Sequence, residues 1–416
     1  MAERTGVVVV GGGPGGVLLA YLLARAGLRV VLLEGRKDFD RRFRGDSVAP
    51  PVLDYLHRFG LAEELLSTIP HGRATTFEWW TPDKRYTIAD YRGSSPRFPY
   101  YALIPQARFL PFLVGKARRH TGFRVEMGAR FTALLHDGAG RVDGVRYRRD
   151  GREHELRADL VVGADGRNSK VLLESDLTPT ELASNIDICW FAVPRLPDDP
   201  SGAGQLALIT EPGAVVGLLG QGDTWQIGFT LPAGRFGEVR AAGVEPLRDL
   251  VRRRTPWLGE RVAELRDPNQ LTLLPIRITE VDRWSRPGLL LIGDAAHVIS
   301  PVGGNGINFA MIDAAEAANL LVGPLRGGDA EAIDVAASQL QRIRGPRVAG
   351  EQRMQVRVER GVARRLAERS PGAPLPIRLQ GGVPGLARFS ARRSLRALHV
   401  PPPSPDVLGP GPSTVD

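Results

Sequence analysis

The sequence predicts an α/β fold in which a parallel sheet is interrupted by a second, mostly antiparallel β-sheet and is followed by a helical region. Three observations support this. A β-branched run at residues 7–10 leads through a glycine-rich turn into an apolar helix, as expected where a buried parallel strand meets its crossover helix. Two further apolar strands, opening the segments 158–171 and 288–321, end in short acidic turns. Between them lie aromatic, β-rich segments at 77–104 and 186–231.

The turn after the first strand has the spacing G-x-G-x-x-G. In this motif the first glycine allows a tight turn, the second lets the backbone approach a pyrophosphate, and the third lets helix and strand pack closely. The helix expected over residues 17–26 would point free N–H groups and its positive dipole end at the phosphates. Pro14 suits the first turn of that helix and Gly27 its C-terminal cap. The predicted cofactor contacts in the turn are Gly11, Gly13, Pro14, Gly15 and Gly16.

A second strand is expected over residues 28–33, and it ends at Glu34. A carboxylate in this place can accept hydrogen bonds from the hydroxyls of a ribose. Strand, glycine turn, helix, strand and terminal acid in this order predict a Rossmann-like, dinucleotide-binding domain. The motif does not by itself distinguish FAD from NAD, and a glycine-rich turn in an unrelated α/β protein is the alternative.

Two later motifs decide between the cofactors. Residues 158–171 read ADLVVGADGRNSKV, and residues 288–321 contain Gly293-Asp294, a glycine-rich loop and a helix expected to begin near Ile307. In order and distance these motifs resemble those of the group A flavoprotein monooxygenases, the p-hydroxybenzoate hydroxylase and UbiH-like family. The resemblance covers roughly residues 6–350. It implies non-covalently bound FAD, with NADH or NADPH as a transient reductant that needs no second nucleotide-binding domain.

The resemblance also assigns roles to individual residues. Asp294 would accept hydrogen bonds from the ribityl chain, and the 303–308 loop would lie along the pyrimidine edge of the flavin, where a helix N-terminus favours negative charge. Arg167 would contact the passing NAD(P)H, and His297 would be structural. The implied FAD contacts outside the first turn are Glu34, Arg44, Gln106, Asp165, Asp294, Gly304, Gly306, Ile307 and Asn308.

By resemblance, NAD(P)H reduces the FAD, dioxygen adds at C4a, and the hydroperoxide delivers one oxygen atom to an aromatic or other electron-rich small molecule, by hydroxylation or epoxidation. A flavin-dependent halogenase is one alternative, but its W-x-W-x-I-P motif is absent at the nearest stretch, residues 224–228. An FAD-dependent reductase of an unsaturated substrate and a non-enzymatic flavin-binding module are the others. The catalytic base is left open among a tyrosine, His57 and an outside water.

The aromatic segments are assigned to a substrate sheet that lies over the flavin, where an apolar pocket can use some of their rings. The predicted substrate contacts are Trp79, Trp190, Trp225 and, from the glycine-rich loop, Pro301. The predicted domains are an FAD-binding domain (1–75, 102–180 and 270–330), a substrate-binding β-sheet domain (76–101 and 181–269), a C-terminal helical region (331–400) and a disordered tail (401–416).

The chain of 416 residues has one cysteine, Cys189, so no internal disulfide can form, and a reducing, cytoplasmic location is expected. The first strand begins near Gly6, which leaves no space for a signal peptide, and no run of about 18 apolar residues predicts a membrane-spanning helix. No spacing predicts a metal site.

The formal net charge is +9, yet only four of the 55 basic residues are lysines, and no zinc-finger or basic-zipper pattern accompanies the charge. The expected partner is therefore a small molecule, not a nucleic acid. Residues 340–399 carry 14 arginines against three glutamates. The helix expected over 330–370 presents these arginines either as a solvated face or as a weak contact with anionic membranes. The oligomeric state is left open.

Overall fold

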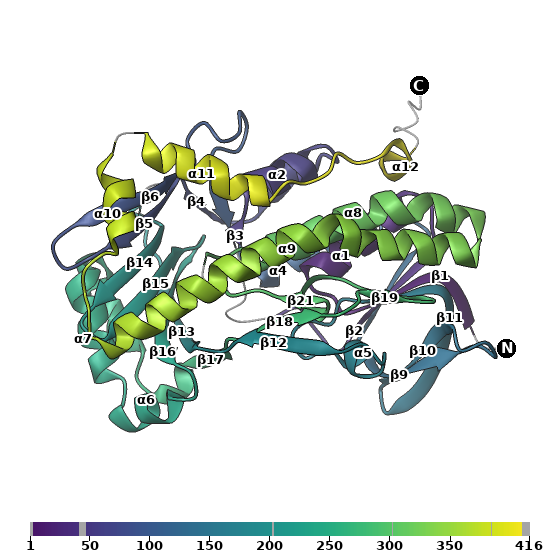
Figure 1. The fold of residues 1–416 in the computed structure, drawn as a ribbon, viewed down its shortest axis with the longest axis horizontal. Coiled ribbons are helices and arrows are strands. Elements are labelled where there is room, and N and C mark those ends of the chain that lie inside the picture. The colour runs from purple at the N-terminus through teal and green to yellow at the C-terminus, as the bar shows by residue number, and fades with distance from the viewer. Residues whose placement is uncertain (1–2, 41–46, 202–203, 302, 384, 410–416) are drawn as a thin grey trace.

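The computed structural model describes residues 3–40, 47–201, 204–301, 303–383 and 385–409. A mainly parallel sheet and a mainly antiparallel sheet lie at opposite ends of an elongated molecule, and a long helix crosses from one to the other (Figure 1).

The parallel sheet forms because its central strands are apolar on both faces; the side chains of residues 7–10 are at most 4% exposed. Its order is β20-β11-β1-β2-β8, and all these neighbours pair in parallel. The bounds are β1 Glu3–Val10, β2 Val30–Glu34, β8 Phe123–Met127, β11 Arg152–Gly163 and β20 Leu289–Leu291. Antiparallel strands extend it: β19 Ser285–Arg286 at the edge, and β9 Arg130–His136 with β10 Val142–Arg149 on β11. The predicted α/β fold class is confirmed.

Helices α1 (Pro14–Arg25), α4 (Gln106–Ala117) and α8 (Gly306–Gly327) pack together beside this sheet. Pro14 occupies the first turn of α1, and Gly27 follows its end with a φ of +85°, a left-handed conformation that favours glycine. Both expectations for this helix are confirmed. The shorter helices of this half are α2 Pro50–His57, α3 Leu61–Thr68 and α5 Lys170–Leu173.

The second sheet has the order β17-β13-β16-β15-β14-β5-β6, and only β14 and β5 pair in parallel. Its bounds are β5 Thr76–Trp80, β6 Arg85–Asp90, β13 Ile186–Pro194, β14 Leu206–Glu211, β15 Ala214–Gly220, β16 Thr224–Pro232 and β17 Thr272–Pro275. Because β17 pairs with β13, this sheet extends beyond the predicted domain boundary at residue 269. An outer layer covers one face: α6 Phe236–Ala242, α7 Glu245–Arg254 and the 3-10 helix η1 Pro256–Glu264, with η2 Pro268–Gln270 following.

Two three-stranded sheets lie between the large ones. One has the order β3-β7-β4, with bounds Ser47–Val48, Tyr101–Leu103 and Gly72–Ala74; the other has the order β12-β18-β21, with bounds Pro179–Ala183, Ile278–Val281 and His297–Val298. A single-turn 3-10 helix, η3 Gly293–Ala295, precedes β21. These short strands belong to the chain segments that connect the parallel sheet with the second sheet.

The C-terminal region is helical, as predicted, with α9 Ala330–Ala367, α10 Leu375–Gly382 and α11 Leu386–Ala397. Helix α9 contacts β19 and β20 near its start, and β13, β15 and β16 of the second sheet. Among the helices of the described ranges, none combines the length and the apolar composition that crossing a membrane requires.

The expectation of a disordered tail over 401–416 is wrong for residues 401–409. Ser404 caps a short helix, α12 Pro405–Leu408, and the fully buried Val407 belongs to the core cluster that includes α1 and α8. The Asn319 side chain accepts a hydrogen bond from the Ser404 N–H at 2.8 Å. A proline-rich composition does not rule out order when one apolar side chain finds a site on packed helices. Residues 410–416 lie outside the described residues.

Candidate cofactor and active site

The glycine turn after β1 is shaped by backbone packing that excludes side chains. A Cβ at Gly11 would lie 2.4 Å from the carbonyl oxygen of Ala164, and one at Gly16 would lie 2.1 Å from the carbonyl oxygen of Gly11. The start of α1 is thereby held tightly against the ends of β1 and β11. Since the first N–H groups of a helix have no intrahelical acceptor, this turn offers donors and a positive dipole end to a pyrophosphate.

Glu34 stands at the end of β2, next to the glycine turn. Its side chain is 4% exposed, and it accepts hydrogen bonds from the Gly12 N–H at 2.9 Å and the Arg36 N–H at 2.8 Å. These bonds hold the carboxylate beside the phosphate-binding turn. The ribose contact stays a prediction, for which this placement is suitable.

The two acidic turns meet because β11 and β20 are neighbouring parallel strands. The Arg167 Nε lies 3.3 Å from the Asp294 Oδ2, and both side chains are about a quarter exposed. Asp165 accepts hydrogen bonds from the Ser169 hydroxyl at 2.5 Å and the Lys170 N–H at 2.7 Å. Asp165 therefore shapes the turn that brings Arg167 to Asp294, and any direct contact of Asp165 with the cofactor stays a prediction.

The loop before α8 is fastened to β3. The Ser47 hydroxyl donates to the Gly304 carbonyl at 2.8 Å, and the Asn308 amide donates to the Ser47 carbonyl at 2.9 Å while accepting from the Ala49 N–H at 2.8 Å. The Asn308 side chain is thus occupied in holding the loop. What Gly306, Ile307 and Asn308 offer a ligand is their backbone N–H groups at the helix start.

A buried charge network holds the Gly293-Asp294 turn from behind. Asp313 on α8 accepts hydrogen bonds from the Gly293 N–H at 3.0 Å, the His297 Nε2 at 2.6 Å and the Arg344 Nε at 2.9 Å. Asp313 and Arg344 are fully buried. Burial by itself raises the pKa of Asp313, but the nearby His297 and Arg344 lower it below its ordinary value. The buried His297 contacts Asp313 and the Trp284 ring, as a structural histidine does.

Behind the same loop, α9 presents a row of polar side chains at four-residue spacing. The Ser300 N–H donates to Gln355 Oε1 at 2.6 Å, and the Gln355 amide donates to Glu351 at 2.8 Å. Glu359, which is 0% exposed, faces the side chains of Ser300 and Asn185. Burial raises the pKa of Glu351 and of Glu359 above the ordinary carboxyl value. This row supports the loop from the side of the long helix.

Glu359→Gln should make stability less dependent on pH. Because the folded-state pKa of Glu359 is raised, wild-type stability falls as pH rises from the ordinary carboxyl pKa through the raised value. A neutral amide of the same shape avoids ionisation in the buried site. Urea unfolding at pH 5, 6, 7 and 8 should therefore show the variant more stable relative to the wild type at the high end of this range than at pH 5. A difference that stays constant across these four pH values would contradict the raised pKa.

The predicted substrate contacts do not share one face of the second sheet. Trp190 lies over Gly217 and Gly228 on the face that also packs against α9, and Trp79, whose ring N–H lies 3.3 Å from Thr210, shares that face. Trp225 was predicted wrongly. It is fully buried on the opposite face, in the cluster with the outer helices, and its ring N–H donates to Asp199 at 2.9 Å.

The remaining predicted residues have mixed outcomes. Gln106 is the buried first residue of α4, directly after β7, and Pro301 is half-buried in the loop before α8. Arg44 lies outside the described residues. His57, one of the bases left open, pairs with Glu63 at the corner between α2 and α3. The described residues therefore give His57 a structural partner and no link to the motifs.

Sequence analysis missed the residues that support the site: Ser47, Asp313, Arg344, Glu351, Gln355 and Glu359. One signal for part of this set was present, because Glu351, Gln355 and Glu359 recur every four residues within an arginine-rich helix. Nothing local pairs Asp313 with Arg344, since that contact depends on how α8 and α9 pack.

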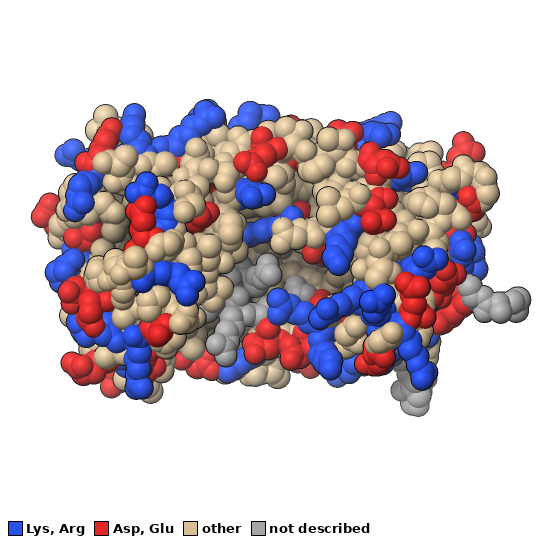
Figure 2. Space-filling model, turned by 90° about the horizontal axis from the view of Figure 1, so that it is seen from below, with Lys and Arg blue, Asp and Glu red and all other residues tan. Residues whose placement is uncertain are grey.

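The molecular face in Figure 2 is hollowed near its middle, and acidic and basic side chains are interspersed over it. This distribution is unlike the one-signed surface that binds a nucleic-acid backbone.

Comparison with known proteins gives matches over most of the chain. A family model described as "FAD binding domain" matches residues 4–344. The 6-methylpretetramide 4-monooxygenase of Streptomyces rimosus is 32% identical over 331 residues, which cover 78% of this chain and 77% of that protein. A digeranylgeranylglycerophospholipid reductase of Methanocella arvoryzae is 27% identical over 353 residues, 80% of this chain and 81% of its own length.

Among solved structures, PqsL of Pseudomonas aeruginosa, described as a probable FAD-dependent monooxygenase, is 25% identical. The two folds superpose with a TM-score of 0.72, and the match covers 89% of this chain and 98% of PqsL.

Proposed function

The chain belongs to the FAD-binding-domain family of the group A flavoprotein monooxygenases, and from this premise we propose that its substrate is a fused-ring aromatic compound. FAD, reduced by NAD(P)H, supplies the redox chemistry and the activation of dioxygen. The chain's own residues bind and orient that cofactor, keep water away from it and position the substrate.

The cofactor part of this function is carried by the meeting of three nucleotide motifs at the carboxyl ends of neighbouring parallel strands. The glycine turn after β1 admits no side chain, and Glu34 lies beside this turn. Asp294 follows β20, the strand next to β11, and forms an ion pair with Arg167. Ligands of α/β sheets bind at this edge. The open N-termini of α1 and α8 suit a pyrophosphate and an electron-rich ring edge, respectively.

The proposed substrate class rests on the relatives and on the second sheet. The Streptomyces rimosus enzyme is named for 6-methylpretetramide, and PqsL has been solved in complex with 2-aminobenzoylacetate. In this chain Trp79 and Trp190 lie on one face of the second sheet, where the Trp190 ring packs flat against Gly217 and Gly228 and gives the face an aromatic surface. We place the aromatic substrate between this face and the loop that contains Pro301.

An isotope experiment tests the proposal. The purified FAD-loaded protein is incubated with NADPH or NADH and a panel of polycyclic phenols under ¹⁸O₂, and products are analysed by mass spectrometry. Incorporation of one ¹⁸O atom supports a monooxygenase acting on this class. A product that gains two hydrogens and forms equally well without dioxygen would instead indicate the reductase activity of the archaeal relative.

Asp294→Ala should raise the Kd for FAD by about tenfold to hundredfold, because a carboxylate that accepts ribityl hydroxyls contributes about 1.5–3 kcal/mol. Arg167→Ala is the matched control, since it removes the same ion pair but keeps the carboxylate. It should retain FAD and slow flavin reduction by NAD(P)H. Titration of the apoprotein with FAD and stopped-flow reduction measure the two effects. Equal FAD affinities in the wild type and Asp294→Ala would show that Asp294 does not bind the cofactor.

We also propose that the arginine-rich C-terminal region touches anionic membranes weakly. Leu379 on α10, Val383 directly after it and Phe389 on α11 are exposed, and α11 also carries the exposed Arg392 and Arg393. Basic side chains gain about 1 kcal/mol each near an anionic leaflet, within a Debye length of roughly 8 Å. At low salt, anionic vesicles should therefore sediment more protein than neutral vesicles, and Phe389→Ser should reduce the difference. If both kinds of vesicle sediment the same amount of protein, the arginine-rich C-terminal region is an ordinary solvated surface.

A further inference from the structure

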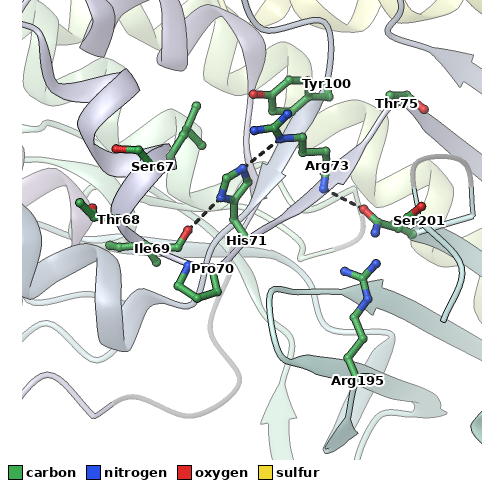
Figure 3. A pocket seen from close by; sticks show the side chains of 12 residues that line it. Ser67, Thr68, Ile69, Pro70, His71, Arg73, Thr75, Tyr100, Arg195 and Ser201 are labelled. Carbon is green, nitrogen blue, oxygen red and sulfur yellow. Dashed lines mark hydrogen bonds between the residues drawn. The ribbon is translucent and has the colours of Figure 1, made fainter. Parts of the chain in front are cut away.

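A cavity of about 770 Å³, wide open to solvent, lies where the two halves of the chain meet, and none of its lining residues belongs to the motifs described above (Figure 3). Its walls come from the end of α3, from β4, and from the segment between β13 and β14. Next to it β4 packs directly on the end of β15, since a Cβ at Gly72 would lie 1.8 Å from the carbonyl oxygen of Gly220. The volume is typical of sites for small molecules.

Arg73 is held in this cavity by three neighbours. Its backbone N–H donates to Gln205 at 2.7 Å, its Nε donates to the His71 Nε2 at 3.2 Å, and its guanidinium lies over the Tyr100 ring, 5.2 Å from the ring centre. Figure 3 shows the guanidinium between the imidazole and the phenol ring. Within the described residues no carboxylate or carbonyl accepts from its two terminal nitrogens. They form the planar fork that matches a carboxylate or phosphate.

His71 is neutral in this arrangement. The His71 Nδ1 lies 2.9 Å from the Ile69 carbonyl, which can only accept, so Nδ1 carries the proton and Nε2 accepts from Arg73. Burial, together with the nearby charge of Arg73, lowers the pKa of His71. The imidazole therefore positions Arg73 without neutralising its charge.

A second guanidinium, that of Arg195, points into the same cavity (Figure 3). It donates to the Gln221 carbonyl at 2.9 Å and the Pro200 carbonyl at 3.0 Å, which fixes its direction without cancelling its charge. Asp199 lies nearby, but its two carboxylate oxygens are taken by Arg261 at 2.6 Å each. No aspartate or glutamate is among the described residues that line the cavity, so two cations give it a positive potential.

We propose that this cavity binds the anionic group of a small ligand, a carboxylate or a phosphate, with Arg73 as the main contact and Arg195 as a second source of positive charge. The identity of the anion rests on the proposed function: it is either an acidic substituent of the aromatic substrate or a phosphate of NAD(P)H. Both have the same chemistry at the guanidinium fork, so the experiment must separate them.

Binding is measured by titration calorimetry on the FAD-loaded protein with three probes: 2-naphthoate, the uncharged 2-naphthamide, and 2′,5′-ADP. The wild type should bind at least one anionic probe, and Arg73→Gln should weaken that binding by about tenfold or more, the effect of losing a charge-assisted hydrogen bond. The amide should be unaffected. Arg342→Gln, an exposed arginine on α9 far along the chain, is the matched control and should change nothing.

The two anionic probes identify the source. Selective weakening of 2-naphthoate assigns the site to an acidic substrate, and selective weakening of 2′,5′-ADP assigns it to the nicotinamide dinucleotide. A measurement without any variant accompanies them: inorganic phosphate should raise the wild-type Kd of the anionic probe and leave that of 2-naphthamide unchanged. If neither anion depends on Arg73 and phosphate competes with neither, the proposal is overturned. These titrations need no turnover, so failure of the monooxygenase assay is a separate result.

Discussion

Asp313→Ala should lower the free energy of unfolding by about 3–5 kcal/mol, the cost of removing one partner from a buried ion pair and leaving the other charge unpaired. Arg344 is fully buried and its Nε is held by Asp313, so the variant would leave a guanidinium without its carboxylate in the core. The His297 ring and the Gly293 N–H would lose their acceptor in the same step. Urea unfolding of the FAD-saturated protein at neutral pH measures the loss.

A paired variant separates charge from packing. Asp313→Leu combined with Arg344→Met removes both charges and should be more stable than Asp313→Ala, since buried ion pairs are often replaceable by apolar residues of similar size. The pH dependence gives a second check. Because the folded-state pKa of Asp313 is lowered, its stabilisation is full above the ordinary carboxyl pKa and is lost as pH falls through the lowered value. A loss below 1 kcal/mol at neutral pH would mean that these groups are not a buried ion pair.

The same variant tests how the third motif, the Gly293-Asp294 turn, is held in place. Asp313 fixes the Gly293 N–H, and Gly293 is followed directly by Asp294. Without that anchor the turn should sample other conformations, and FAD affinity should fall even though Asp294 itself is unchanged. Wild-type FAD affinity in a destabilised Asp313→Ala would show that the turn is held by its own backbone.

The parts predicted well from sequence are those whose geometry is local. The turn from β1 into α1 needs glycines at fixed offsets, a proline in the first helical turn and a left-handed residue after the last, and each requirement is readable within the residues concerned. The strand run at 7–10 is apolar on both faces because both faces are buried. Such features can be predicted from residues that are close together in the sequence.

Errors occurred where tertiary packing decides the outcome. Trp190 and Trp225 both lie on strands of the second sheet, but the outer layer of α7 and η1 covers only the Trp225 face of the sheet. Val407 is buried because its short segment docks on α1 and α8, which its proline-rich composition does not indicate. Asp313 and Arg344 become partners only when two successive helices pack antiparallel. None of these contacts follows from local periodicity.

Gly16→Ala should abolish tight FAD binding, raising the Kd by roughly a hundredfold or more, as expected when two or more charge-assisted hydrogen bonds to the pyrophosphate are lost. The added Cβ would lie 2.1 Å from the Gly11 carbonyl oxygen and 3.1 Å from the Ala164 Cβ. The first collision is with backbone, so no side-chain rotation relieves it. The start of α1 must then move away from β1, and its N–H groups no longer point at the phosphate position.

Gly115→Ala in α4 is the matched control, because a Cβ there meets no atom within 4 Å and alanine favours a helix. It should bind FAD as the wild type does and be equally stable or slightly more so. Fluorescence titration of each apoprotein with FAD gives the affinities, and far-UV circular dichroism verifies that Gly16→Ala keeps its secondary structure. A folded Gly16→Ala whose Kd for FAD stays within threefold of the wild type would show that this turn does not cradle the cofactor, and the assignment of the first motif would have to be abandoned.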